Sequence, residues 1–144
     1  MKTISILFLL TFLFAATNIT LSQEFYFCDE VDDNWNPIGA SDIKSAGGIN
    51  FLTKLDKQVF NTMYMWVIYK TDENGNDTDF VNEYVMRIED DIEKTGARFF
   101  CTTQKINFEP GRYKVYFIYE ADKETLIKNG NLKKYLSKGT VTVN

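Results

Sequence analysis

The chain of 144 residues contains no histidine, two cysteines and two prolines. Without histidine it lacks the commonest general base, the commonest zinc ligand and the base of the usual hydrolase triad. Two cysteines cannot form a four-thiolate zinc site, and no glycine-rich phosphate loop is present. Carboxylates are plentiful, but they cluster in turns, and none is identifiable as the acid in an apolar cleft that a glycosidase needs. We therefore expect no enzyme, no cofactor and no metal site.

The chain also lacks a face of strong positive charge. It carries 16 lysines and arginines against 20 aspartates and glutamates, for a net charge of −4. Affinity for nucleic acid depends on the neutralisation of phosphates, and anionic membranes attract basic segments. Neither nucleic acid nor, once a leader is removed, a membrane is therefore expected as a partner.

The one long apolar run, Ile4–Ala16, stands near the N-terminus after a single lysine. It is shorter than the roughly 20 apolar residues that span a bilayer, and it fits the apolar region of a secretory signal peptide. Thr20 and Ser22 supply the small residues that precede a cleavage site. We expect a signal peptide of residues 1–22, a mature domain of residues 23–144 and a secreted or periplasmic location, with an N-terminal membrane anchor as the alternative.

Apolar residues after the leader recur mostly at every second position, which favours strands. An acidic stretch at 89–96 predicts one helical turn, and residues 123–138 predict a short strand followed by a helical turn at 131–136. About seven strands separated by turn residues predict an all-β fold, a single antiparallel sandwich. The predicted strands cover residues 24–31, 47–55, 62–70, 80–88, 97–108, 111–120 and 139–143.

Two aromatic residues occupy positions typical of Ig-type sandwiches. Tyr113 comes two residues after a turn glycine, in the place of a corner tyrosine whose hydroxyl bonds to backbone upstream. Trp66 lies in the middle of a strong strand, where such folds bury a tryptophan. With the aromatic first strand and the final Gly139–Val143, the chain resembles small Ig-like β-sandwich domains of exported bacterial proteins, mostly of unassigned function. The resemblance implies the fold and a binding or accessory role, and it implies no reaction.

The order of Cys28, Trp66 and Cys101 is superficially that of an antibody domain. In that family the second cysteine lies two residues after the corner tyrosine, where this chain has Val115. If the cysteines lie on the first and fifth strands, both flank the second strand at roughly 9–10 Å. A disulfide requires Cα atoms within about 7 Å. We expect two buried thiols with a structural role, and a disulfide stays open if the first strand has crossed between sheets.

The polar turn at 32–42 contains Trp35, the tryptophan best placed to be exposed. Exposed aromatic rings with polar neighbours stack on the faces of sugars, so Trp35, Asp33 and Asn36 form a candidate carbohydrate site. Other aromatic residues that could join it, if they face outward, are Tyr26, Tyr69 and Tyr84. The alternative is that Trp35 packs under its own loop.

The stretch Asp72–Glu83 partly matches a calcium-binding EF-hand loop. Its first, third, fifth and twelfth positions fit, but Asp77 stands at the sixth, where glycine is required. The flanking residues predict strands, so a polar hairpin loop around Asn74 and Gly75 is the simpler interpretation. A weak calcium site in the first acidic turn, Asp29–Asn36, stays open in the same way.

These observations predict an exported, non-catalytic interaction module that contacts another protein or the cell envelope as a monomer. The alternative is a carbohydrate-binding module that uses exposed aromatic residues near Trp35.

Overall fold

The computed structural model describes residues 23–89, 91–124 and 134–144, and these residues form an all-β fold. The expected signal peptide and residues 131–133 of the helical turn expected at 131–136 lie outside the described residues. Residues 134–136 are described and are not helical. Seven of the strands are five residues or longer. The elements are β1 (Glu24–Cys28), β2 (Glu30–Val31), β3 (Pro37–Ile38), β4 (Ile43–Lys44), β5 (Gly47–Val59), β6 (Met63–Thr71), β7 (Asp77–Arg87), α1 (Ile92–Thr95), β8 (Ala97–Cys101), β9 (Ile106–Phe108), β10 (Gly111–Tyr119), η1 (Glu120–Asp122) and β11 (Ser137–Val143).

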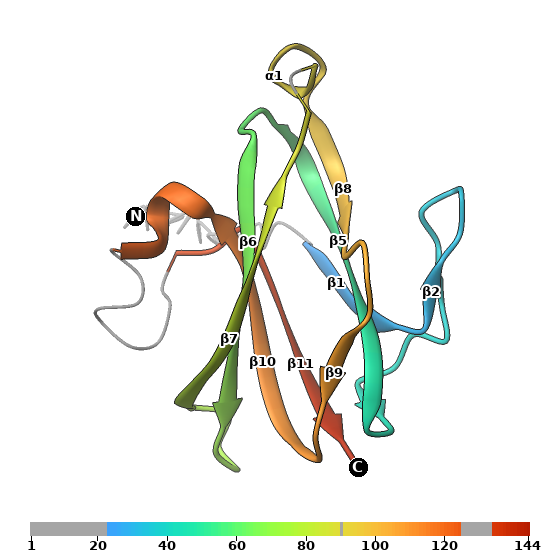
Figure 1. The fold of residues 1–144 in the computed structure, drawn as a ribbon, viewed down its shortest axis with the longest axis vertical. Coiled ribbons are helices and arrows are strands. Elements are labelled where there is room, and N and C mark those ends of the chain that lie inside the picture. The colour runs from blue at the N-terminus through green and yellow to red at the C-terminus, as the bar shows by residue number, and fades with distance from the viewer. Residues whose placement is uncertain (1–22, 90, 125–133) are drawn as a thin grey trace, which may run out of the picture.

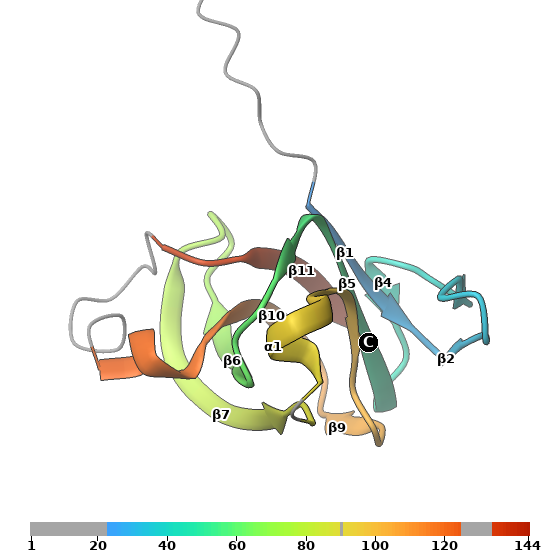
Figure 2. The same cartoon turned by 90° about the horizontal axis from the view of Figure 1, so that it is seen from above.

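Two sheets face each other (Figures 1 and 2). The first has the order β1-β5-β8, with β9 paired to the beginning of β5, and the second has the order β4-β11-β10-β6-β7. The short strands β2 and β3 form a separate hairpin. The prediction of antiparallel sheets is confirmed for these pairs with one exception, because β4 pairs parallel with β11.

The prediction of one strand over residues 97–108 is wrong, because this segment forms the two strands β8 and β9. Both pair with β5, but at different places along it. Between them the Thr102 hydroxyl accepts a hydrogen bond from the Phe51 backbone N–H at 3.1 Å. A side-chain oxygen here takes the place of a backbone acceptor, so the strand ends and restarts at Ile106.

Side chains from both sheets share one core. The inward positions of β5 place Ile49, Phe51 and Leu55 against the second sheet. Trp66, only 2 % exposed, lies with its ring 6.3 Å from that of Phe51 and 5.1 Å from that of Phe117. Burying such a side chain contributes roughly 1.5–3 kcal/mol, which explains the aromatic composition of the strands.

Tyr113 stabilises the turn into β10. Its hydroxyl donates to the Glu109 carbonyl oxygen at 3.0 Å, and its ring meets that of Phe108 edge-on at 4.8 Å. This is the upstream backbone hydrogen bond that a corner tyrosine makes. A Cβ atom at Gly111 would lie 3.3 Å from the Tyr113 ring, so the glycine lets the ring fold back over the turn.

The outer face of the second sheet carries its own apolar cluster, formed by Met65, Val67, Tyr116 and Ile118. The Tyr116 hydroxyl donates to Asp77 at 2.7 Å, and the Lys114 ammonium lies 3.0 Å from the other Asp77 oxygen. Burial, with the bond to Asp77, raises the pKa of Tyr116. The cluster is fully buried, so it offers no open surface.

Both cysteines are free and flank β5, but only Cys28 is buried as expected, whereas Cys101 is half-buried. Cys28 pairs with Asn50 on one side, and Cys101 pairs with Leu52 on the other. Burial raises the pKa of Cys28 to about 11 and also raises that of Cys101. Because the thiolate is the reactive form, both groups are kept in their inert state.

Candidate functional site

The loop of the β2–β3 hairpin is organised by Asp32. Its carboxylate accepts hydrogen bonds from the backbone N–H groups of Asn34 at 2.9 Å and Asn36 at 2.8 Å, and from the Asn36 amide at 3.0 Å. The Asp32 carbonyl accepts from the Trp35 N–H at 3.0 Å. The N–H of Asn36 is the largest of the contacts that hold the pKa of Asp32 below its usual 3.8.

The loop between β6 and β7 has the same architecture, centred on Asp72. This carboxylate accepts from the N–H groups of Asn74 at 2.9 Å and Asn76 at 2.8 Å, and from the Asn76 amide at 3.0 Å. The amide of Asn76 is the main cause of the lowered pKa of Asp72. Asp72 therefore binds its own loop, and the calcium interpretation gains no support from this geometry.

The two loops differ at their fourth residue. Gly75 has φ +80° and Trp35 has φ +61°, the one positive φ of a non-glycine residue in the described part of the chain. The left-handed region costs a side-chain-bearing L-residue roughly 1–2 kcal/mol, and glycine avoids this cost. A tryptophan therefore stands where the loop geometry favours glycine.

Trp35 stacks on Phe99 of β8, with ring centroids 5.8 Å apart and an angle of 29° between the ring planes. The two side chains are 37 % and 39 % exposed, and Ile38 on the same hairpin is 49 % exposed. We call these three residues the Trp35 platform. Figure 1 shows the hairpin on the side of β5 that faces away from the second sheet.

The hairpin covers part of this outer face. Leu52 points outward by strand alternation, yet Leu52 and the neighbouring Cys28 are completely buried. Lys44 forms an ion pair with Asp29 and also donates to the Gly39 carbonyl at 2.9 Å, which links the base of the hairpin to β4. The hairpin that carries Trp35 and Ile38 is therefore held in place by these contacts.

The candidate sugar-site residues have different environments. Trp35 does not pack under its own loop alone, because it reaches β8. Asp33 is exposed, whereas Asn36 is engaged with Asp32. Tyr26 lies on the same outer face, with the Lys54 ammonium 5.6 Å from its ring centroid. Tyr69 and Tyr84 belong to β6 and β7 in the other sheet, so they do not join Trp35.

Phe99 was missed by sequence reasoning, although a signal for it exists. Phe99 and Phe100 are adjacent, and adjacent side chains in a strand point to opposite faces. Phe100 is 1 % exposed in the core, so Phe99 must face outward.

A cleft of about 280 Å³ opens between β7 and the connection from β8 to β9. Its apolar lining comes from Trp66, Tyr84, Met86 and Ile106, and its polar lining includes Thr102–Gln104. Among the described residues, its lining contains no cysteine, aspartate or glutamate, and its charged member is Arg87.

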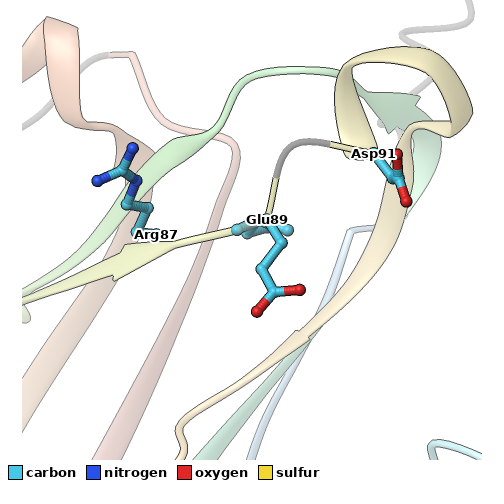
Figure 3. A pocket seen from close by; sticks show the side chains of 4 residues that line it. Arg87, Glu89 and Asp91 are labelled. Carbon is cyan, nitrogen blue, oxygen red and sulfur yellow. The ribbon is translucent and has the colours of Figure 1, made fainter.

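A wider hollow lies beside Arg87, Ile88, Glu89 and Asp91. Figure 3 shows the charged groups of Arg87, Glu89 and Asp91 pointing in different directions. A catalytic site requires groups that converge on one reacting atom. The charged groups of these three described residues therefore do not converge on one point.

In the part of the chain that the structure describes, no three or more histidine, cysteine, aspartate or glutamate residues gather where they could hold a metal ion. Over the same residues, no helix has the length and apolar character needed to cross a membrane. No protein-family model matches this chain, and no curated protein matches it either.

Proposed function

We propose that this chain is an exported, non-catalytic binding module with an Ig-like sandwich fold, and that it contacts a protein or the cell envelope through the Trp35 platform. The observation that carries the proposal is the positive φ of Trp35. In the matching loop Asp72–Asn76, the same position is occupied by Gly75, which adopts a positive φ without strain. Strained residues concentrate where a side chain has a function that compensates for its cost.

The strand order supports the Ig-like part of the proposal. The order β1-β5-β8 opposite β11-β10-β6 matches strands A, B and E opposite G, F and C of an Ig domain. The chain departs from that pattern in having β7 at the edge beside the C-like β6 and, among the described residues, no strand in the place of D beside β8. Tyr113 makes the upstream backbone hydrogen bond expected of a corner tyrosine, and Trp66 is buried on the C-like strand β6, although both cysteines are free and no disulfide packs against it.

The composition of the platform supports a contact role. Tryptophan and other aromatic residues dominate the energetics of protein interfaces, because they bury much area for few rotatable bonds. Stacking on Phe99 restricts the Trp35 ring before any partner arrives, which lowers the entropy cost of binding.

The test compares the tagged mature chain with Trp35→Gly, which converts the loop to the type found at residues 72–76. Cross-linking in cells should recover a partner with the wild type and lose at least nine-tenths of it with Trp35→Gly. Ile43→Thr removes an equally apolar exposed residue (63 % exposed) elsewhere and should recover the partner normally. Equal recovery by the wild type and Trp35→Gly would contradict the proposal.

A carbohydrate ligand is the second candidate, and the stacking geometry favours it. Phe99 covers one face of the Trp35 indole, and the side chain is still 37 % exposed. An open indole face can stack on the C–H groups of a pyranose ring. If this is the function, the wild type should bind insoluble cell-wall polysaccharide, Trp35→Gly should not, and Ile43→Thr should bind normally.

A further inference from the structure

The strand β7 is the last strand of its sheet among the described residues, so one of its edges has no neighbour. It is eleven residues long, and its exposed apolar side chains are Phe80 (51 %), Val81 (42 %) and Val85 (53 %). A long free edge with apolar side chains is a template for pairing with another strand.

In the middle of this edge, one backbone N–H group is hydrogen-bonded to a side chain instead of to another strand. The N–H of Glu83 donates to the Asn82 side-chain oxygen at 2.8 Å. This N–H is therefore not used by the ladder with β6. Rotation of the Asn82 side chain would release it to the carbonyl of an added strand.

The cleft of about 280 Å³ lies beside the same edge, between β7 and the β8–β9 connection. Figure 2 shows β7 and β9 along the same side of the molecule. Side chains of a strand added to β7 would alternate in direction, so every second one would point toward this cleft. Its apolar lining, which includes Tyr84, Met86 and Ile106, fits one aliphatic or aromatic side chain.

The charge around β7 indicates which residues an added strand should carry outside the cleft. From residue 79 to residue 93 the chain has six acidic residues and a single basic residue, Arg87. One of the six, Glu83, forms an ion pair with Lys123, so the attraction depends mainly on the other acidic residues. Asp79, Glu89 and Asp91 are exposed at or near the ends of β7. Basic residues that flank an added strand would therefore be attracted, whereas acidic ones would be repelled.

We propose that β7 binds an extended, basic peptide segment of a partner protein by strand addition, with one apolar side chain of that segment in the cleft. In such complexes main-chain hydrogen bonds supply affinity and pockets for alternate side chains supply specificity. This surface is separate from the Trp35 platform, and it goes beyond the function proposed above.

The probe is a set of fluorescein-labelled heptapeptides with lysine at both ends, threonine within, and alanine, leucine or phenylalanine at the centre. Fluorescence anisotropy should show that the leucine and phenylalanine peptides bind the mature chain at least tenfold more tightly than the alanine peptide. Asn82→Ala should strengthen binding several-fold, because it uncovers the Glu83 N–H.

Glu83→Pro removes the Glu83 N–H and should abolish peptide binding. The matched control Glu83→Gln keeps this N–H, and its affinity for the peptides should fall by no more than severalfold. If Glu83→Pro lowers the melting temperature, Gln104→Trp tests the cleft instead, because Gln104 is exposed and lines it. That variant should remove the preference for a large central residue. Trp35→Gly should bind the peptides like the wild type, which separates this proposal from the platform.

Absence of binding to both the wild type and Asn82→Ala would overturn the proposal, as would equal binding by Glu83→Pro and Glu83→Gln. Sedimentation velocity supplies a third outcome. A dimer that forms with increasing concentration and is lost in Glu83→Pro would mean that a second copy of this chain occupies the edge, and the peptide partner would be rejected.

Discussion

The loops Asp32–Asn36 and Asp72–Asn76 share a hydrogen-bonding scheme but differ in their surroundings. The corresponding donor–acceptor distances agree within 0.1 Å. The pattern Asp-x-Asn-x-Asn thus specifies one local structure at two places. At the fourth residue one loop has glycine with open space around it, and the other has a tryptophan stacked on Phe99.

Comparing the two loops shows which residues are needed to build the loop and which are not. The aspartate and the two asparagines suffice to build the loop, since they do so twice. The tryptophan is not needed for this structure and opposes it, because its φ lies in the left-handed region. Its role must therefore lie outside the loop: it stacks on Phe99 of β8, and the proposed contact with a partner would be a second role.

The largest effect is expected when the tryptophan is transferred to the other loop. Gly75→Trp places a bulky residue at φ +80°, where nothing lies within 4 Å of its Cβ atom. With no aromatic partner to compensate, it should destabilise the protein by roughly 1–2 kcal/mol. Urea denaturation measures this. Gly75→Asn is the control and should cost less, because asparagine tolerates this conformation. Unchanged stability in Gly75→Trp would refute the strain argument.

A smaller effect is expected at Trp35 itself, where the glycine variant should be more stable than the alanine variant. Trp35→Gly and Trp35→Ala both lose the stacking on Phe99, but only alanine keeps the backbone strain. Trp35→Gly should therefore be more stable than Trp35→Ala by roughly 1 kcal/mol, whereas alanine is ordinarily the more stabilising residue. Thermal and urea denaturation of both variants give the difference. A more stable alanine variant would show that the positive φ carries no cost.

The smallest effect concerns pH and should be equal in the two loops. Folding lowers the pKa of both Asp32 and Asp72 below 3.8, so their contribution to stability is present above that pH. It is lost as the pH falls through the lowered values of the folded state. Asp32→Asn and Asp72→Asn should each flatten the dependence of the urea midpoint on pH between about pH 5 and pH 2. A clearly unequal response would mean that the loops are not equivalent in solution.

Much of the fold was predictable from local patterns. The Asn-Gly pair predicted the β6–β7 hairpin, and the acidic stretch predicted the single turn of α1. The sequence around Gly111 indicated a corner tyrosine, whose hydrogen bond to Glu109 spans only four residues. Such features depend on neighbours in the chain, so a single sequence contains enough information about them.

The candidate site was predictable only in part. Exposure of Trp35 was inferred from its polar turn, but its support by Phe99 joins residues 64 positions apart. The division of residues 97–108 into two strands depends on a bond from Phe51 to Thr102 across 51 residues. The cleft beside β7 likewise combines β6, β7 and β9, which no local pattern places together.

The sequence by itself determined the alternation of the strands, the loops built on Asp32 and Asp72, and the absence of histidine chemistry. These properties follow from composition, from backbone geometry and from hydrogen bonds between near neighbours. The tertiary structure decided which strand lies at the free edge, which aromatic ring supports Trp35 and where the cleft opens. It decided them because sheet order and packing depend on the burial of side chains from distant segments, and that burial is optimised over the whole chain at once.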